Sequence, residues 1–417
     1  MVKVAAFLPA NDMQKCMKIL AGKPLYLYNL EKLIKCNNID EVYLCSESNH
    51  ILDYADYLDY NKCKKNNIFS SSDNVDKIRE KIHRIDTDIF AQISYEKPFI
   101  NIETIQKCID HILNNENCDC VTLVRSKEQT FSMNKYNQTY DMQNLIEMSA
   151  GFFAIRSSTI CNNNICINGS IHLIPCNATE DIEVKFQNDF DLADTVMTGI
   201  RHKEVTTMRL LSNHLTSSAI SDVLKEYSIN STIGGLKPNI SGKKILGRAN
   251  TLKIRHLNVE EDDVRIYDAL NTYSLVKEGD IIIVDTDVPE RAYFGDLNAN
   301  LAIRSGAIAT VVNGVTRDTK KVKDLDYPVY AAGSCCNDIK YEGAIESHNK
   351  PICIQNVMIY PDDLVFCDEE GIVIIPKYLE TEVIKKVLSV ISNEHKIISK
   401  ILSGFSPEDI INSCGFF

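Results

Sequence analysis

GDLNANLA occupies residues 295–302, and VVNGVTRD follows at residues 311–318, with Gly306 between them. Twenty residues separate Asp296 from the adjacent pair Arg317 and Asp318. The apolar run at residues 309–312 predicts a buried strand just before that pair. Alternatively, Arg317 and Asp318 could simply form an ion pair on a turn. The sequence on either side therefore has to decide between a turn and a binding site.

The surrounding sequence predicts a compact domain of short strands and glycine-containing turns. A helix carrying Ser221 and Asp222 opens this half, and a long amphipathic helix at about residues 379–402 closes it. The strands come at GRANT, EGDIIIVD and DEEGIVIIP, which are residues 247–251, 278–285 and 368–376. Their spacing places residues 295–318 inside one folded unit.

The first 200 residues follow a different pattern, in which strands alternate with helices. Such alternation implies parallel βαβ units and a doubly wound sheet. The pattern changes around residues 200–212, so we expect two domains, residues 1–206 and 207–417. The expected strands are residues 2–8, 41–45, 89–93, 120–124 and 152–155, and the expected helices are residues 25–36 and 102–113.

Composition excludes several classes of partner. The net charge of -12 disfavours nucleic acid, which needs a basic surface. No apolar run is long enough for a membrane span, so we expect no membrane partner. The 15 cysteines include no C-x-x-C pair, which favours free thiols in a reducing, cytoplasmic compartment. Histidines such as His83, His111 and His395 have no catalytic spacing.

With its context, the Asp296 to Arg317-Asp318 spacing resembles the D-x20-R-D pattern of class II 4-hydroxy-4-methyl-2-oxoglutarate aldolases, a family that includes the regulators of ribonuclease activity A. The resemblance covers about residues 211–404 and implies an α/β/β swivelling-domain-like aldolase fold. It also implies a homotrimer or homohexamer, with a carboxylate from a neighbouring subunit, for which Glu394 is a candidate. One departure is Pro361-Asp362-Asp363, where the family has Pro-Gly-Asp; aspartate tolerates a positive φ better than most residues.

The family resemblance assigns roles to these residues. Asp318 is the metal ligand, and oxygen ligands favour Mg²⁺ or Mn²⁺. Asp296 orients metal-bound water, and Arg317 holds a substrate carboxylate bidentately. Retro-aldol or decarboxylase-type chemistry leaves charge on an enolate oxygen, which such a cation stabilises. Backbone N–H groups at Gly295, Leu297 and Asn298 are expected to bind the pyruvyl carboxylate.

The first half resembles acylneuraminate and 3-deoxy-octulosonate cytidylyltransferases over about residues 2–200. This implies a nucleotidyltransferase-like (Rossmann-like) sheet and CTP as a substrate. The residues that carry the likeness are VAAFLPA at 4–10, KILAGKPL at 18–25, IDEVY at 39–43, Gln92 with Pro98-Phe99, GFFAIR at 151–156, EDIE at 180–183 and NDFDLA at 188–193.

A CTP site needs cations and backbone amides around the triphosphate. The expected nucleotide or metal residues are Lys15, Lys23, Gln92, Asp181 and Glu183. If residues 180–183 form a strand, Asp181 and Glu183 share one face of it, which suits a common cation. The loop after the first strand departs from the family, because residues 11–16 are short and contain no glycine to wrap a phosphate.

Three functions are consistent with the sequence. The first is a fusion protein of 2-keto sugar-acid metabolism, with metal-dependent lyase chemistry in its second half and a divergent, non-catalytic first half. The second is a bifunctional enzyme that also transfers CMP from CTP to a nonulosonic or octulosonic acid. The third is a non-enzymatic binding or regulatory oligomer. In the first two, the partner is a small keto acid or sugar acid.

Overall fold

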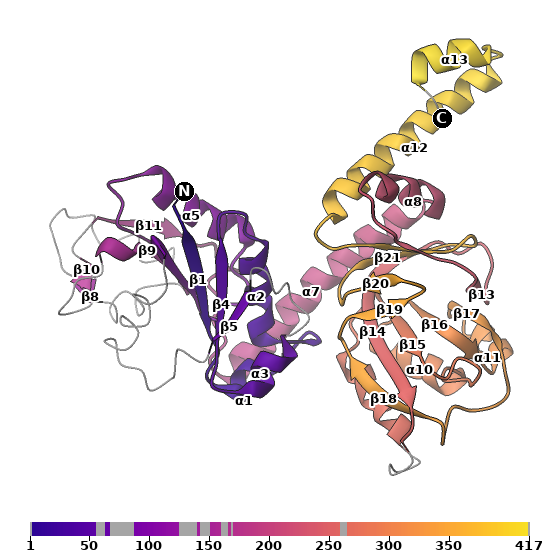
Figure 1. Cartoon of the computed structure of the whole chain (residues 1–417), viewed down its shortest axis with the longest axis horizontal. Coiled ribbons are helices and arrows are strands. Elements are labelled where there is room, and N and C mark those ends of the chain that lie inside the picture. Colours follow the sequence, from indigo (N-terminus) through magenta and orange to yellow (C-terminus); the bar gives the residue numbers. More distant parts are fainter. Residues whose placement is uncertain are drawn as a thin grey trace. The chain divides into compact units, whose positions relative to one another are not determined.

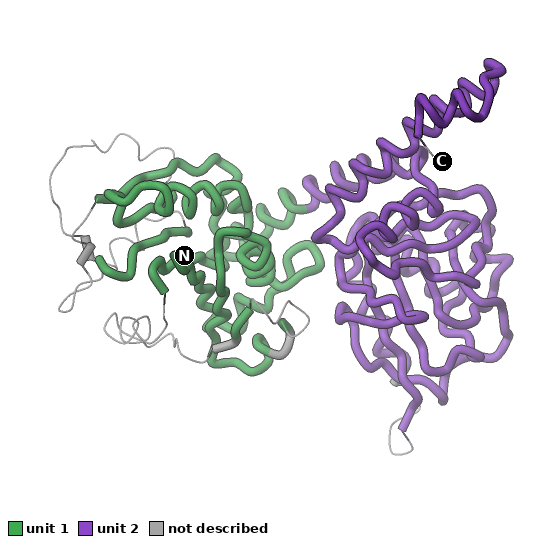
Figure 2. Tube along the Cα trace, turned by 45° about the horizontal axis from the view of Figure 1, so that its top comes forward, with its two compact units in different colours: residues 1–197 green, residues 198–417 purple. Residues whose placement is uncertain are grey.

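The chain forms two compact units, Met1–Met197 and Thr198–Phe417 (Figure 1; Figure 2). The computed structural model describes residues 2–55, 63–66, 87–124, 140–141, 151–159, 166–167, 170–258 and 265–415. The division falls within helix α7 (Gln187–Ser212), and the boundary expected between residues 206 and 207 lies in the same helix. His83 lies outside the described residues.

Unit 1 is built on a seven-stranded sheet. Its order is β11-β7-β9-β6-β1-β4-β5, and β1 pairs in parallel with β4 and β6. The α/β class is confirmed, but β9 runs antiparallel to β6 and β7, so the sheet is mixed. Strand β9 is as buried as the parallel strands of the sheet, so its composition did not reveal that it runs in the opposite direction. The strands are β1 (Val4–Pro9), β4 (Glu41–Cys45), β5 (Cys63–Asn66), β6 (Ile89–Ile93), β7 (Cys120–Val124), β9 (Phe152–Arg156) and β11 (Ile171–Pro175).

Two amphipathic helices cover this sheet. Helix α2 (Leu25–Lys35) packs on β1 and β4, and α5 (Ile102–Asn114) packs on β7 and β9. The apolar face of α5 carries Ile105, Ile109 and Ile112 at helical spacing, and all three are fully buried. The remaining described elements are α1 (Met13–Cys16), β2 (Ile19–Leu20), β3 (Lys23–Pro24), α3 (Asn49–Tyr54), β8 (Tyr140–Asp141), η2 (Ser157–Thr159) and β10 (Cys166–Ile167).

Unit 2 contains a larger mixed sheet centred on β14. Strands β14, β15, β16 and β17 are parallel neighbours, whereas β21 and β18 pair antiparallel with the first and second parts of β14. Apolar cores form on both faces of the parallel strands. The strands are β12 (Thr232–Ile233), β13 (Lys237–Pro238), β14 (Ile245–His256), β15 (Asp280–Thr286), β16 (Ala309–Thr316), β17 (Val329–Ser334), β18 (Gly343–His348), β21 (Leu364–Cys367) and β22 (Ile372–Ile375), with a separate hairpin β19 (Ile352–Ile354) and β20 (Val357–Ile359).

Helices connect the parallel strands of unit 2. Helix α10 (Asp296–Ser305) lies between β15 and β16, and α11 (Thr319–Asp324) lies between β16 and β17. Gly306 ends α10 with a φ of +95°, a conformation that glycine adopts without a Cβ penalty. The other helices are α8 (Ser217–Glu226), η3 (Arg265–Asp268), α9 (Ala269–Thr272), η4 (Tyr273–Leu275), α12 (Glu380–Leu402) and α13 (Pro407–Cys414). No helix in the described ranges has the length and apolar character needed to cross a bilayer.

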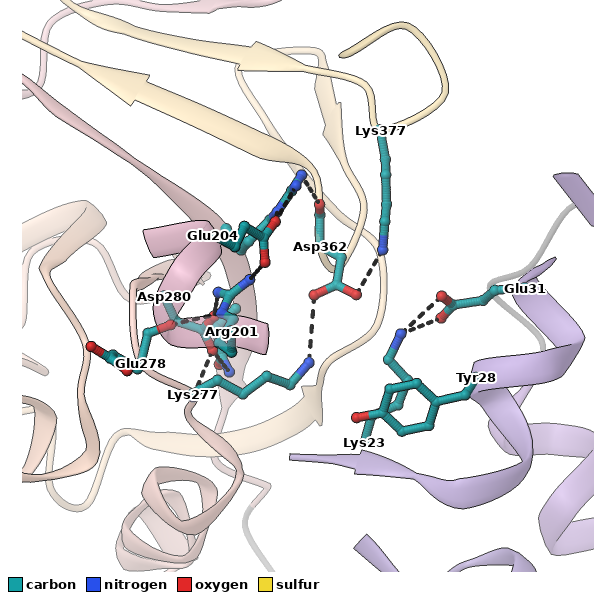
Figure 3. Close-up of polar contacts among 12 residues, drawn as sticks. Lys23, Tyr28, Glu31, Arg201, Glu204, Lys277, Glu278, Asp280, Asp362 and Lys377 are labelled. Atoms are coloured by element: carbon teal, nitrogen blue, oxygen red, sulfur yellow. Dashed lines mark hydrogen bonds and ion pairs between the residues drawn. The ribbon is translucent and has the colours of Figure 1, made fainter. Parts of the chain in front are cut away.

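A buried charge network fixes the second part of α7 to unit 2. Arg201 Nη2 lies 2.7 Å from Asp280 Oδ1 (Figure 3), and Arg248 Nε donates to Glu204 Oε1 over 2.9 Å. Arg248 also donates to Glu380 at the start of α12, over 2.6 Å. Burial alone would raise the pKa of Glu204, but the two arginines outweigh it and lower that pKa. The network therefore joins α7, β14, β15 and α12.

The turn that departs from the family pattern keeps the geometry that a glycine would adopt. Asp362 has a φ of +69°, in the left-handed region that aspartate tolerates. Its carboxylate lies 2.9 Å from Lys377 Nζ and 3.5 Å from Lys277 Nζ (Figure 3). Two lysines thus neutralise the aspartate that stands in place of glycine.

Candidate active site

The predicted residues of unit 2 lie at one edge of its parallel strands. Asp296 begins α10 after β15, and Arg317 and Asp318 follow β16 directly. Asp338 follows the next strand, β17. Because the carboxyl ends of neighbouring parallel strands meet at the same edge, the topology brings these three segments together. Such an edge is where open α/β sheets commonly bind ligands.

The segment before α10 is joined to the end of β16. Arg317 N donates to Phe294 O over 3.0 Å, and Thr316 Oγ1 donates to the same oxygen over 2.7 Å. A further β-bridge connects Ala292 to Asp338 after β17. These backbone contacts fix the start of α10 relative to the two loops that follow it.

Gly295 packs closely against the charged pair. A Cβ at this position would lie 2.8 Å from Asp318 Oδ2 and 3.1 Å from Arg317 Cγ. Carbon and oxygen atoms do not approach that closely, so either side chain would have to move. The glycine at the start of the motif therefore lets Arg317 and Asp318 approach the backbone of α10.

Arg317 lies between two carboxylates. Its Nη1 is 2.6 Å from Asp338 Oδ2, and its Nε is 3.6 Å from Asp318 Oδ2. The arginine side chain is 37% exposed and the Asp318 side chain 35%. A ligand can reach both groups, which distinguishes this pair from the buried arginines of the α7 network.

Asp296 faces Lys321 and Asp318. Lys321 Nζ lies 3.0 Å from Asp296 Oδ2. Hydrogen bonding with that ammonium lowers the pKa of Asp296, and contact with the Asp318 side chain acts in the same direction. The structure thus brings together all three residues that the D-x20-R-D pattern predicted.

The start of α10 carries the residues whose N–H groups were expected to bind a ligand, and the Leu297 N–H bonds to the Asp296 carboxylate. Leu297 is 73% exposed, and the Asn298 side-chain amide donates to Tyr293 O over 2.7 Å. The Asn298 side chain is therefore committed to the protein. Any ligand binding by Gly295, Leu297 or Asn298 would use their N–H groups, as the sequence analysis expected.

The carboxylates at this edge suit a cation whose shell is largely water. In the described part of the chain, no three His, Cys, Asp or Glu side chains are placed to share a metal ion. Asp318 and the adjacent Asp296 offer oxygen atoms only. That donor set fits Mg²⁺ or Mn²⁺, which keep several waters, and does not fit a closed zinc site.

In unit 1, the segment expected to bind phosphate forms a turn of helix. Residues 13–16 make α1, and the Asp12 side chain accepts from Lys15 N over 3.1 Å. That N–H is therefore satisfied within the protein. The Lys15 ammonium lies 3.4 Å from Glu96 Oε1. Both groups that would meet a phosphate have intramolecular partners.

Lys23 also has a carboxylate partner. Its Nζ donates to both oxygens of Glu31, over 2.9 and 2.8 Å, and lies over the Tyr28 ring (Figure 3). Gln92 lies on β6 opposite Phe7 of β1 and is partly buried.

The strand on which Asp181 and Glu183 would share a face is not formed. Residues 176–186 form a turn and a loop, so no strand places the two carboxylates on one face. Asp181 accepts from the buried Lys97 Nζ over 3.0 Å, and Glu183 lies 3.1 Å from Lys185 Nζ. Each carboxylate has its own lysine partner, because the chain turns here after β11 instead of extending.

Comparison with known proteins agrees with the division of the chain into two units. Residues 217–374 match a family model described as Aldolase/RraA, and residues 13–214 match one described as Cytidylyltransferase. A putative 4-hydroxy-4-methyl-2-oxoglutarate aldolase of Halalkalibacterium halodurans is 30% identical over 174 residues, covering 41% of this chain and 78% of that protein. The chain belongs to the Aldolase/RraA family. Its first half is a cytidylyltransferase domain.

Two further relatives extend the comparison. Protein DlpA of Legionella pneumophila is 30% identical over 193 residues, which cover 46% of this chain but only 31% of DlpA. The chain thus matches less than a third of the length of DlpA. A solved structure of CMP:2-keto-3-deoxy-manno-octonic acid synthetase complexed with CTP is 12% identical, covering 47% of this chain and 99% of that one, with a TM-score of 0.36.

Two charged residues of the Aldolase/RraA domain were missed by the sequence analysis. Asp338 follows β17, the last of four parallel strands, so the strand-end rule would have included it had the pairing been known. Lys321 lies three residues after Asp318, a spacing that places side chains on one side of a helix. No composition signal marks either residue.

Proposed function

We propose that the Aldolase/RraA domain is a divalent-cation-dependent lyase that cleaves a pyruvyl-containing 2-keto acid by retro-aldol chemistry. The supporting observation is the meeting of Asp296, Arg317 and Asp318 around Gly295, with Arg317 and Asp318 accessible to solvent. A bound Mg²⁺ or Mn²⁺ would supply Lewis-acid stabilisation of charge on a substrate oxygen.

The side chains divide the remaining work. Asp318 would hold the cation, and Asp296 would accept hydrogen bonds from its waters and orient them. Arg317 would bind the substrate carboxylate with its planar guanidinium, exchanging or sharing its contact with Asp338. The N–H groups of Leu297 and Asn298, at the positive end of α10, would hold the same ligand.

The cytidylyltransferase domain is proposed to be divergent and inactive towards CTP. Its phosphate segment forms α1, where Asp12 already accepts from Lys15 N. Aspartate also places negative charge where a triphosphate would bind. A retained fold that binds a 2-keto sugar acid would suit fusion to a lyase for the same compound class, in the synthesis of surface polysaccharide.

A bifunctional enzyme is the second candidate. The match to the cytidylyltransferase family over residues 13–214 favours it, and CTP-dependent release of pyrophosphate would distinguish it. A non-enzymatic regulator is the third, and it would bind no divalent cation through Asp318. A homotrimer or homohexamer remains part of the proposal, with Glu394, exposed on α12, as a candidate for a neighbouring subunit's site.

The test measures pyruvate release by the full-length chain from a panel of 2-keto acids with Mg²⁺. Arg317→Ala should reduce the rate by about 10²–10³-fold, as loss of a charge-stabilising donor does in other enzymes. Arg304→Ala, an exposed arginine at the end of α10, is the matched control and should be near wild type. Absence of pyruvate from every substrate, or full activity of Arg317→Ala, would contradict the proposal.

A further inference from the structure

Lys321 lies at the carboxylates assigned above to the cation and to its waters. Its Nζ is 3.0 Å from Asp296 Oδ2, and the residue lies on α11 just after Asp318. A lysine side chain is an ammonium ion at neutral pH, so a cationic group is held next to the Asp296 carboxylate.

The neighbouring charges are almost balanced by the protein itself. Arg317 contacts Asp318 and Asp338, and Lys321 contacts Asp296. Within this cluster, three carboxylates face two cationic groups, so a single negative charge is unmatched. Loss of Lys321 would leave two unmatched negative charges, and the cluster would then attract a divalent ion more strongly.

We propose that Lys321 is a built-in counter-ion, which a divalent cation must displace from Asp296 and which thereby weakens the affinity of the site for that cation. The inference rests on the proposed function, since it assumes that the ion binds through Asp318. The side chain is 69% exposed and has a flexible stem, so it can leave without rearrangement of the fold.

Electrostatics sets the expected size of the effect. Repulsion between an ammonium group and a divalent ion a few ångströms away is worth about tenfold in affinity, even at the dielectric constant of water. Because Lys321 is exposed, salt should screen this repulsion. The affinity difference caused by Lys321 should therefore shrink as ionic strength rises.

The experiment measures binding of Mn²⁺ to the full-length chain by calorimetry or by electron paramagnetic resonance of free Mn²⁺. Lys321→Gln should bind Mn²⁺ about tenfold more tightly than wild type at low salt, and Lys321→Arg should restore the weaker affinity. Lys320→Gln, an adjacent exposed lysine on α11, is the matched control and should change affinity less than twofold. Equal tightening by Lys320→Gln, or none by Lys321→Gln, would overturn the inference.

Asp318→Asn separates this inference from the function on which it rests. It should abolish Mn²⁺ binding in both the wild-type and Lys321→Gln backgrounds; tight binding that survives it would place the ion elsewhere and overturn the inference. If wild type binds Mn²⁺ through Asp318 but Lys321→Gln binds no more tightly, the counter-ion role fails and the proposed function stands. If neither chain binds Mn²⁺, both fail.

Discussion

The predicted residues of the two units differ in what they contact. In unit 2, Asp296, Arg317 and Asp318 contact one another or a shared neighbour at the ends of adjacent parallel strands. In unit 1, Lys15 and Lys23 each pair with a nearby glutamate. A motif identifies residues of the right type in both units, and in unit 2 it also identifies residues that contact one another.

The cause of the difference is local chain length. In unit 2, each strand is followed by a segment long enough to bring its charged residue to the common edge. In unit 1, the segment after β1 is short and closes on itself as α1, capped by Asp12. A family resemblance can thus extend over a whole domain while one loop departs from the family pattern.

The largest expected effect comes from the charge network of α7, whose residues stabilise the fold of unit 2 and lie outside the proposed site. Arg248→Met leaves Glu380 partly buried without its guanidinium and leaves Glu204 with Arg201 alone, which should cost about 3–5 kcal/mol of stability. Hydrogen exchange of peptides from β14 in the full-length chain measures it. Arg304→Met is the exposed control. A cost below about 1 kcal/mol would mean that the network contributes little, as in many surface pairs.

The next effect tests the close approach at the site. Gly295→Ala should lower pyruvate release by about 10²-fold, because the added Cβ displaces Asp318 or Arg317 from its position. Gly234→Ala is the control, since nothing lies within 4 Å of a Cβ there. Equal activity of Gly295→Ala and wild type would show that the site tolerates movement of the pair.

A smaller effect depends on pH. Burial lowers the pKa of His348 to about 4 from an ordinary 6.5, while its Nε2 lies 2.9 Å from Asn250 Oδ1. The folded state therefore favours the neutral ring, so its stabilising contribution is present above pH 6.5 and is lost as pH falls towards 4. Between pH 7 and pH 5 the loss should be about 2 kcal/mol.

His348→Gln removes this titration. The acid-side decline in stability, measured by hydrogen exchange of β14 and β18 peptides, should be shallower in the variant than in wild type. Parallel declines in the two proteins would show that His348 is not kept neutral by the fold. Carboxylates that titrate in both proteins cancel in the comparison.

The smallest effect concerns unit 1. Glu31→Gln removes the carboxylate that pairs with Lys23, so any CTP bound there should bind about threefold more tightly. Glu116→Gln, an exposed glutamate of the same unit, controls for net charge. Measurement is by equilibrium binding of CTP to the full-length chain with Mg²⁺. Equal changes in the two variants would mean that Lys23 is no nucleotide ligand.

Much of the fold follows from local patterns. Strands β4, β6 and β7 have the predicted bounds, and α2 and α5 differ from prediction by a single residue at one end. Such segments are fully buried or strongly amphipathic, so their apolar spacing identifies them. The direction of β9 and the turn at Asp181 could not be predicted, because strand direction and loop path depend on distant pairing partners.

The sequence by itself determined the two family memberships, the boundaries of several strands and helices, and the three charged residues of the D-x20-R-D pattern. Tertiary structure alone decided which charges meet: it added Lys321 and Asp338 to the site and gave Lys15, Lys23, Asp181 and Glu183 separate partners. The physical reason is range. Periodicity records whether a side chain is buried, whereas electrostatic function depends on distances of a few ångströms between residues that only strand pairing and loop length bring together.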